Sequence, residues 1–163
     1  MNALLLTTNA GLEDIVEAEF RELADAARLR YDGVETQPNE LKGRVRIPTD
    51  EPADRLVPVA RKMRSIHHVL RYIHTFAFDP DDPKGSIYRE VRSVDIPELE
   101  AAGSFRITTN RHGDHDFTSM DVQNWAGQAV VDRWGTDVDL TGYDTDVRVD
   151  IFKDKCLIGV QYT

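Results

Sequence analysis

Apolar and polar residues in the first half of the chain follow helical and strand periods in turn. Leu12, Val16 and Phe20 recur at a spacing of four residues, which is typical of one helix face. The pattern predicts a buried strand at residues 3–8, a helix at residues 12–27, strands at residues 29–35 and 41–47, a helix that starts at residues 49–52 with a capping side chain and an early proline, and a strand at residues 67–78. Two helices therefore alternate with four strands.

This order, β-α-β-β-α-β, matches a ferredoxin-like unit in which two helices cover one face of a sheet. It ends at Asp79 to Pro83, where two prolines among three aspartates cannot continue a strand. We therefore predict a protein of the α/β (α+β) class with two domains, an N-terminal ferredoxin-like domain at residues 1–78 and a second α/β domain at residues 79–163.

The second half of the chain has its own series of elements. The pattern predicts two short helices, at residues 87–94 and 96–102, then a strand at residue 105, a helix from residue 118, an alternating strand at residues 147–152 and a closing strand at residues 155–162. Thr118 and Asp121 resemble a capping box with Asp in place of the usual Glu. Gly135 is placed to end the same helix.

The charge of the chain argues against a nucleic-acid partner at first sight. The 163 residues carry 29 acidic and 20 basic side chains, a net charge of −9, and a polyanion repels an acidic protein. Asp outnumbers Glu and Arg outnumbers Lys, a composition that suits a high-salt cytoplasm in which exposed charges are screened. The local placement of arginine therefore decides the choice of partner.

Few residues of the chain suggest catalysis. The single cysteine, Cys156, lies in an apolar run without an evident base, so we expect a core thiol in a reducing, cytoplasmic compartment rather than a nucleophile. The chain has no phosphate-binding loop, no paired CxxC and no apolar run long enough for a membrane span. His112, Asp114, His115 and Asp116 resemble metal ligands, but their spacing fits a solvated turn, and we predict no metal site.

A candidate binding site lies at residues 104–118. Arg106, Asn110, Arg111, His112 and Phe117 gather where a strand gives way to a helix, an arrangement that suits a phosphate backbone and an unstacked base. Two of these residues have a plainer interpretation. Phe117 also fits a hydrophobic staple before the helix, and Asn110 also fits a simple turn former.

A second basic run extends from Arg61 to Arg71 and includes Arg64 and His68. Positive charge near a helix C-terminus complements the helix dipole, and this interpretation competes with RNA binding. Both interpretations stay open on the sequence alone.

The segment FRITTNRHGDHDFTSMDVQNWAGQAVV resembles the core of a THUMP domain. The upstream TTNAGLEDIVEAEFREL is similar to the opening of THUMP-containing RNA methyltransferases, MRSIHHVL is similar to their segment between the subdomains, and DVRVDIFKDKCLIGV is similar to the last THUMP hairpin. The resemblance implies a ferredoxin-like domain followed by a THUMP α/β domain, which together bind tRNA and, in some members, ribosomal RNA.

The resemblance also implies a role for the chain and for particular residues. It implies an RNA-binding targeting module of a tRNA or rRNA guanine-N2 methyltransferase, whose S-adenosylmethionine-binding catalytic domain is absent from this chain. The implied RNA-binding residues are Arg106, Asn110, Arg111, His112, Phe117, Thr118 and Ser119, with Arg64, His68 and Arg71 extending the contact. Asp114 and Asp116 depart from the more basic family turn. The alternatives are a stand-alone THUMP adaptor that delivers tRNA to a separate modifying enzyme, and an acidic domain that binds proteins.

Overall fold

The computed structural model describes residues 2–163, which divide into two compact units. The first comprises residues 2–72 together with Gln161–Thr163, and the second comprises Ile73–Val160. The division falls within one strand, β4 (His68–Ala77). The domain boundary that the sequence places after residue 78 stays a prediction.

The first unit has the strand order of a ferredoxin-like fold. Its elements are β1 (Ala3–Thr7), α1 (Glu13–Ala26), β2 (Glu35–Thr36), the short 3-10 helix η1 (Pro38–Glu40), β3 (Arg44–Pro48), α2 (Ala53–Ala60) and the first part of β4. The sheet order is β2-β3-β1-β4, and each neighbouring pair is antiparallel. This order, reached by two helical crossovers, is that of the split β-α-β arrangement, so the predicted ferredoxin-like topology is confirmed.

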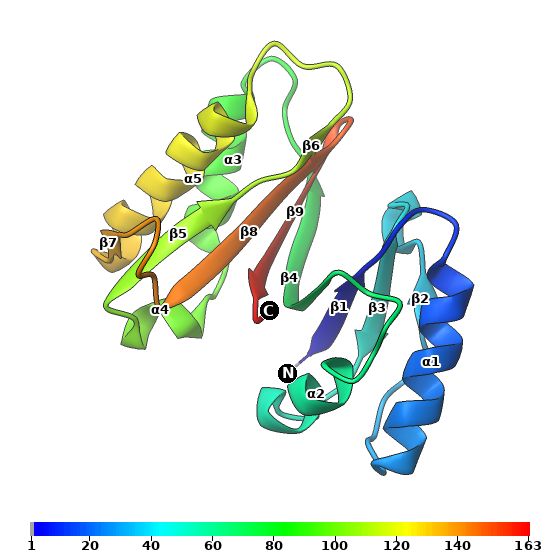
Figure 1. Ribbon diagram of the computed structural model, residues 1–163. Coiled ribbons are helices and arrows are strands. Elements are labelled where there is room, and N and C mark those ends of the chain that lie inside the picture. The colour runs from blue at the N-terminus through cyan, green and yellow to red at the C-terminus, as the bar shows by residue number, and fades with distance from the viewer. Residues whose placement is uncertain (1) are drawn as a thin grey trace. The chain divides into compact units, whose positions relative to one another are not determined.

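Both helices of the first unit pack on one face of its sheet (Figure 1). Leu4 and Leu6 of β1 point toward Phe20 of α1 and Leu56 of α2 in one apolar cluster. Alternate strand residues face the same side because side chains alternate along a strand. Leu5 therefore lies on the opposite face, where it is aligned with Arg46 and Leu70 on the neighbouring strands.

The predicted strand at residues 29–35 is wrong for most of its length. Only Glu35 and Thr36 pair with β3, and Arg28 and Gly33 have positive φ angles of 57° and 73° that interrupt an extended chain. Leu29 is buried in the core, so its apolar character reflects packing rather than strand pairing.

The start of α2 also differs from the prediction. Pro52 is the N-cap, and no side chain caps the helix. Thr49, in the segment expected to supply the capping side chain, instead donates its hydroxyl hydrogen to the carbonyl oxygen of Arg30 and accepts a hydrogen bond from the Glu51 amide. The Thr49 hydroxyl therefore links this segment to the loop that contains Arg30.

Glu13, the first residue of α1, links the turn before α1 to the turn before β3 through hydrogen bonds. It is 4% exposed, and its carboxylate accepts hydrogen bonds from the backbone amides of Gly11, at 2.9 Å, and Gly43, at 2.9 Å. The Gln37 side chain donates a third, at 3.3 Å. Burial by itself raises the pKa of Glu13, but the amides that bind its charged form outweigh burial and leave the pKa below the usual value.

We expect Glu13→Gln to make the stability of the first unit less dependent on pH. A lowered native pKa stabilises the fold above the unfolded-state pKa of about 4.3, and this contribution disappears as the pH falls through the native pKa. At pH 7 the variant should lose about 2 kcal/mol of unfolding free energy, the scale of hydrogen bonds to a charged group. Urea unfolding at pH 7 and pH 3 checks this. An equal loss at both pH values would contradict it.

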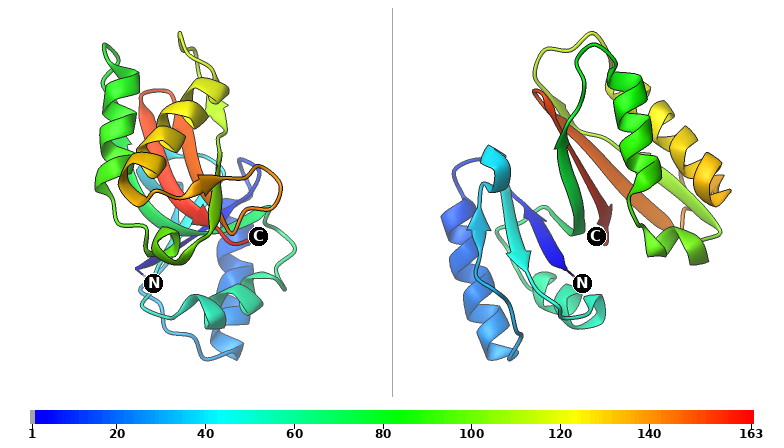
Figure 2. Two further views of the ribbon diagram at one scale, coloured as in Figure 1. Left: turned by 90° about the vertical axis from the view of Figure 1, so that its left-hand side faces the viewer. Right: turned by 180° about the vertical axis from the view of Figure 1, so that it is seen from behind.

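The second unit is a mixed sheet with its long helices on one face (Figure 2). It comprises the end of β4, α3 (Pro83–Ser93), α4 (Pro97–Ala101), β5 (Ser104–Thr108), β6 (Arg111–His112), α5 (Ser119–Trp134), β7 (Asp137–Val138), β8 (Thr145–Phe152) and β9 (Lys155–Gln161). The sheet order is β4-β9-β8-β5-β7, with β6 paired to β8. Strands β7 and β8 both run parallel to β5, and α3 packs along α5.

Strand β8 is buried on both faces. Val147 and Val149 belong to the core, but Arg148 and Asp150, which alternate with them, are only 2% and 1% exposed. Nε of Arg148 donates a hydrogen bond of 2.9 Å to Asp150 Oδ1. Buried charges require partners, and this pair supplies them within a single strand.

Candidate nucleic-acid interface

The candidate site lies in the connection from β5 through β6 to α5. Thr118 is the N-cap of α5: its Oγ1 accepts the Asp121 amide hydrogen, and the Asp121 carboxylate accepts the Thr118 amide hydrogen. The predicted capping box is therefore confirmed, as is the stop at Gly135, which has a left-handed backbone. Because Asp121 already occupies one amide at this helix end, the end alone offers an anion less than an uncapped helix would.

The side chain of Arg111, in this connection, is held by two hydrogen bonds. Its Nη1 donates hydrogen bonds to the Gly113 carbonyl oxygen, at 3.0 Å, and to Nδ1 of His115, at 2.8 Å. Nε2 of His115 donates in turn to the Lys153 carbonyl oxygen, at 2.6 Å. Arg111 and His115 therefore form a chain of hydrogen bonds that ends on the β8–β9 turn.

Aromatic rings pack beneath this chain of hydrogen bonds. Phe117 is 7% exposed, and its ring centroid lies 4.8 Å from that of His115, 5.3 Å from that of Trp125 and 5.7 Å from that of Phe78. Phe117 precedes the N-cap and packs on Trp125 of α5, and its role as a hydrophobic staple stays a prediction. His112, in contrast, is exposed and stacks on Phe152 with ring centroids 5.3 Å apart.

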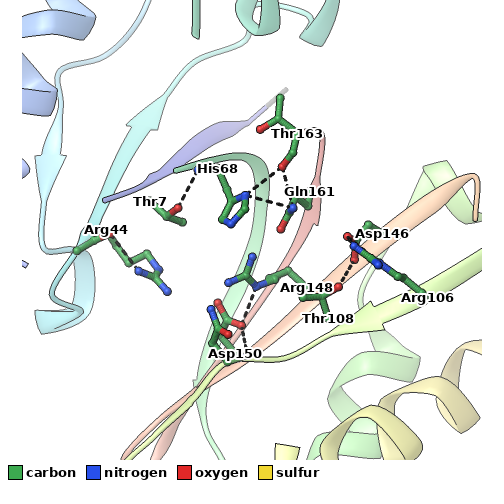
Figure 3. Close-up of polar contacts among 12 residues, drawn as sticks. Thr7, Arg44, His68, Arg106, Thr108, Asp146, Arg148, Asp150, Gln161 and Thr163 are labelled. Carbon is green, nitrogen blue, oxygen red and sulfur yellow. Dashed lines mark hydrogen bonds and ion pairs between the residues drawn. The ribbon is translucent and has the colours of Figure 1, made fainter. Parts of the chain in front are cut away.

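Arg106 projects from β5 into a different set of contacts (Figure 3). Its guanidinium donates to Oδ2 of Asp146 from both Nε, at 3.2 Å, and Nη2, at 3.0 Å, while Thr108 donates to the other oxygen of Asp146. Arg106 also lies over the ring of Tyr143, 4.1 Å from its centroid. Its positive charge is therefore matched by a buried carboxylate.

Asn110 and Ser119 occupy the two ends of the connection. The Asn110 amide donates to Asp150 Oδ1, at 2.8 Å, and its carbonyl oxygen accepts from the Ile151 amide. Ser119 is the first residue of α5 and is partly exposed. Together with Arg111 and Thr118, these residues belong to one continuous segment of the second unit.

The predicted residues of the other basic run belong to the first unit. Arg64 is exposed, and its backbone amide donates to the carboxylate of Glu19, which also binds Ser65. Nδ1 of His68 lies 3.2 Å from the Thr163 carbonyl oxygen, a contact drawn in Figure 3. Arg71 lies in β4 opposite Leu4. An RNA-binding role for all ten predicted residues stays a prediction.

Three features of this region were not indicated by the sequence. The sequence grouped His115 with potential metal ligands, whereas its Nδ1 accepts a hydrogen bond from Arg111. Asp146 and Asp150 are buried and hold Arg106 and the Asn110 amide in place. Only the alternation of β8 carried a signal for them, because it placed two acids and an arginine on a single strand face.

The structure also describes the potential metal ligands, the single cysteine and the helices. Among residues 2–163 no group of three or more His, Cys, Asp or Glu side chains could hold a metal ion. Burial raises the pKa of the Cys156 thiol well above its usual value, with the charges of Asp150 and Glu90 adding to the effect. None of the helices in the described part of the chain has the length and apolar character that a bilayer crossing requires.

Comparisons with known proteins give a consistent picture. The family model described as THUMP domain matches residues 85–161. The chain is 35% identical over 157 residues to the tRNA (guanine(6)-N2)-methyltransferase of Thermus thermophilus, covering 96% of the chain and 44% of that protein. It is 28% identical over 166 residues to the enzyme of the same name from Methanocaldococcus jannaschii, covering 97% of the chain and 40% of that protein.

A solved structure extends the likeness to three dimensions. The crystal structure of TrmN from Thermus thermophilus matches with a TM-score of 0.77 and 35% identity, covering 99% of the chain and 45% of the TrmN chain. The chain therefore spans less than half the length of each of these relatives.

Proposed function

Residues 85–161 belong to the THUMP domain family, as their sequence indicated, and on that premise we propose that the chain is the RNA-binding targeting module of a tRNA guanine-N2 methyltransferase. The observation that carries the proposal is the likeness of 96% of the chain to a tRNA methyltransferase more than twice as long. The module would hold tRNA through phosphate contacts, which position without reading sequence.

The connection from β6 to α5 supports this proposal chemically. It presents an arginine held by uncharged groups, an exposed histidine and the first amides of a helix. Guanidinium groups and helix N-termini both bind phosphate oxygens. A cluster of this kind attracts RNA locally even on a chain with a net charge of −9, because charges beyond about 8–10 Å are screened at physiological salt.

The turn between β1 and α1 of the first unit does not fit S-adenosylmethionine, the methyl donor of the proposed enzyme. The turn between β1 and α1 offers backbone amides after a strand, as a cofactor-binding turn would. The carboxylate of Glu13, however, already accepts a hydrogen bond from the Gly11 amide of this turn. We therefore assign the cofactor, which supplies the methyl group, and the catalytic residues to sequence outside this chain, and the module's part is to bind and orient RNA.

A binding measurement tests the proposal directly. Filter binding of the chain to full-length tRNA and to tRNA trimmed at the acceptor end, at several salt concentrations, should show salt-dependent affinity for the full-length RNA and weaker binding of the trimmed one. Equal failure with both RNAs at low salt would overturn the proposal and favour a protein partner.

We expect Arg111→Ala to weaken tRNA binding about tenfold, the equivalent of roughly 1.4 kcal/mol for a charged hydrogen bond. The melting temperature should change little, because Arg111 is half-buried and its partners are loop groups. Arg92→Ala is the matched control: Arg92 is exposed in the last turn of α3, and its carbonyl contacts Arg133 in the last turn of α5, so it lies near the opposite end of that helix. Equal loss of affinity in both variants would contradict a local site.

A further inference from the structure

Arg111 differs from other arginines of the second unit in the charge of its partners. Arg106, Arg133 and Arg148 each form an ion pair with an aspartate. Arg111 forms no ion pair with any residue of the described chain, and both acceptors of its Nη1 are uncharged. Its guanidinium is therefore fixed in direction while its charge stays uncancelled by a direct partner.

His115 supplies one of those two acceptors, and its ring is itself held firmly. Because Nε2 donates to the Lys153 carbonyl oxygen, the ring carries its proton on Nε2, and Nδ1 presents a lone pair to Arg111. The ring packs against Phe117 and Phe78. Hydrogen bonding on one edge and aromatic contact on the faces thus set where Nδ1 points.

The other edge of the Arg111 guanidinium is unused. Nη2 makes no hydrogen bond within residues 2–163 and is accessible to solvent, whereas the adjacent Nε is buried without an acceptor. Buried donors in native proteins nearly always have partners, so an unpaired one calls for an explanation. Nε and Nη2 together form the fork that matches two oxygens of one phosphate.

We propose that His115 is a positioning residue, which orients Arg111 so that Nη2 donates a hydrogen bond to a backbone phosphate of the bound RNA. Nε becomes the second donor to that phosphate once the atoms that bury it move aside. This proposal rests on the proposed RNA-binding function and deepens it. His115 itself contacts no RNA, and its contribution is to remove the rotational freedom of a long side chain before binding.

Two substitutions of His115 separate positioning from a merely structural role. His115→Phe keeps an aromatic ring against Phe117 but removes the acceptor for Arg111. His115→Asn loses the ring but retains an oxygen near the position of Nδ1. The measurements are the dissociation constant for full-length tRNA and the melting temperature of the chain.

We expect His115→Phe to weaken tRNA binding about fivefold, and His115→Asn to bind within about twofold of the wild-type chain despite a lower melting temperature. The order of affinity should thus run opposite to the order of stability. Arg111→Lys should bind nearly as weakly as Arg111→Ala, because an ammonium lacks the planar fork. In the Arg111→Ala background, His115→Phe should add no further loss.

His74→Phe is the matched control, since His74 stacks on Phe76 and pairs with Glu90 in the same unit and should leave the affinity unchanged. Wild-type tRNA affinity in His115→Phe, affinities that follow the melting temperatures, or additive losses with Arg111→Ala would each overturn the positioning role while leaving the proposed function intact. Absence of tRNA binding by the wild-type chain would overturn both.

Discussion

Gly43→Ala is expected to lower the unfolding free energy of the first unit by about 2–4 kcal/mol, the sum of a left-handed backbone penalty and overpacking. Gly43 has a φ of +73°, and a Cβ at this position would lie 2.5 Å from the carbonyl oxygen of Thr8. That oxygen belongs to the backbone, which the Thr8 amide already anchors by donating to the Gly43 carbonyl. Native-state hydrogen exchange of the β1 amides measures the loss.

Gly33→Ala provides a matched control for this prediction. Gly33 has the same φ of +73°, but nothing lies within 4 Å of its Cβ position. It should therefore cost only the conformational part, about 1 kcal/mol. Equal losses in the two variants would mean that the close approach to Thr8 is relieved by movement of the turn.

The second large effect is expected for Asp150→Ala, which should destabilise the second unit by about 3–5 kcal/mol. The substitution leaves the buried guanidinium of Arg148 without the carboxylate 2.9 Å from its Nε, and it removes the acceptor of the Asn110 amide. Removing one partner of a buried charge pair costs more than the pair contributes. Unfolding followed by fluorescence reports on this unit because Trp125 and Trp134 both lie within it.

Two comparisons isolate the charge as the cause. Asp154→Ala, an exposed change in the β8–β9 turn, should be nearly neutral. The double variant Arg148→Met/Asp150→Leu should recover a large part of the stability lost in Asp150→Ala, since it removes both charges. A double variant no more stable than Asp150→Ala would assign the loss to packing instead.

Local signals in the sequence were sufficient to predict an element where its capping residues and its hydrophobic period indicate the same boundaries. Thr118, Asp121 and Gly135 marked both ends of α5 because capping boxes and left-handed C-caps depend on residues within one turn. The alternation of strands and helices in the first unit followed from the spacing of its apolar residues, except at residues 29–35, of which only Glu35 lies in a strand. Leu29 was misassigned because a single buried leucine in a loop has the same hydropathy as one in a strand.

The polar contacts of the second unit could not be predicted because they join residues far apart in the chain. Asp146 meets Arg106 across 40 positions, and His115 meets the Lys153 carbonyl across 38. Periodicity indicates that Arg148 and Asp150 share a face, but it cannot show that this face is buried. For the same reason, the contact between Arg111 and His115 was not recognised, and the binding role of Arg111 stays a prediction.

The last three residues rejoin the first unit, and this makes the second unit an insertion within a ferredoxin-like host. The Tyr162 amide donates to the Val69 carbonyl, and the Val69 amide donates to the hydroxyl oxygen of Thr163, so the first unit gains these contacts only after residues 73–160 have been synthesised. Exchange of the inserted unit between relatives should therefore graft residues 73–160 and leave Gln161–Thr163 with their host. A truncation after Tyr72 would remove Gln161–Thr163 from the first unit.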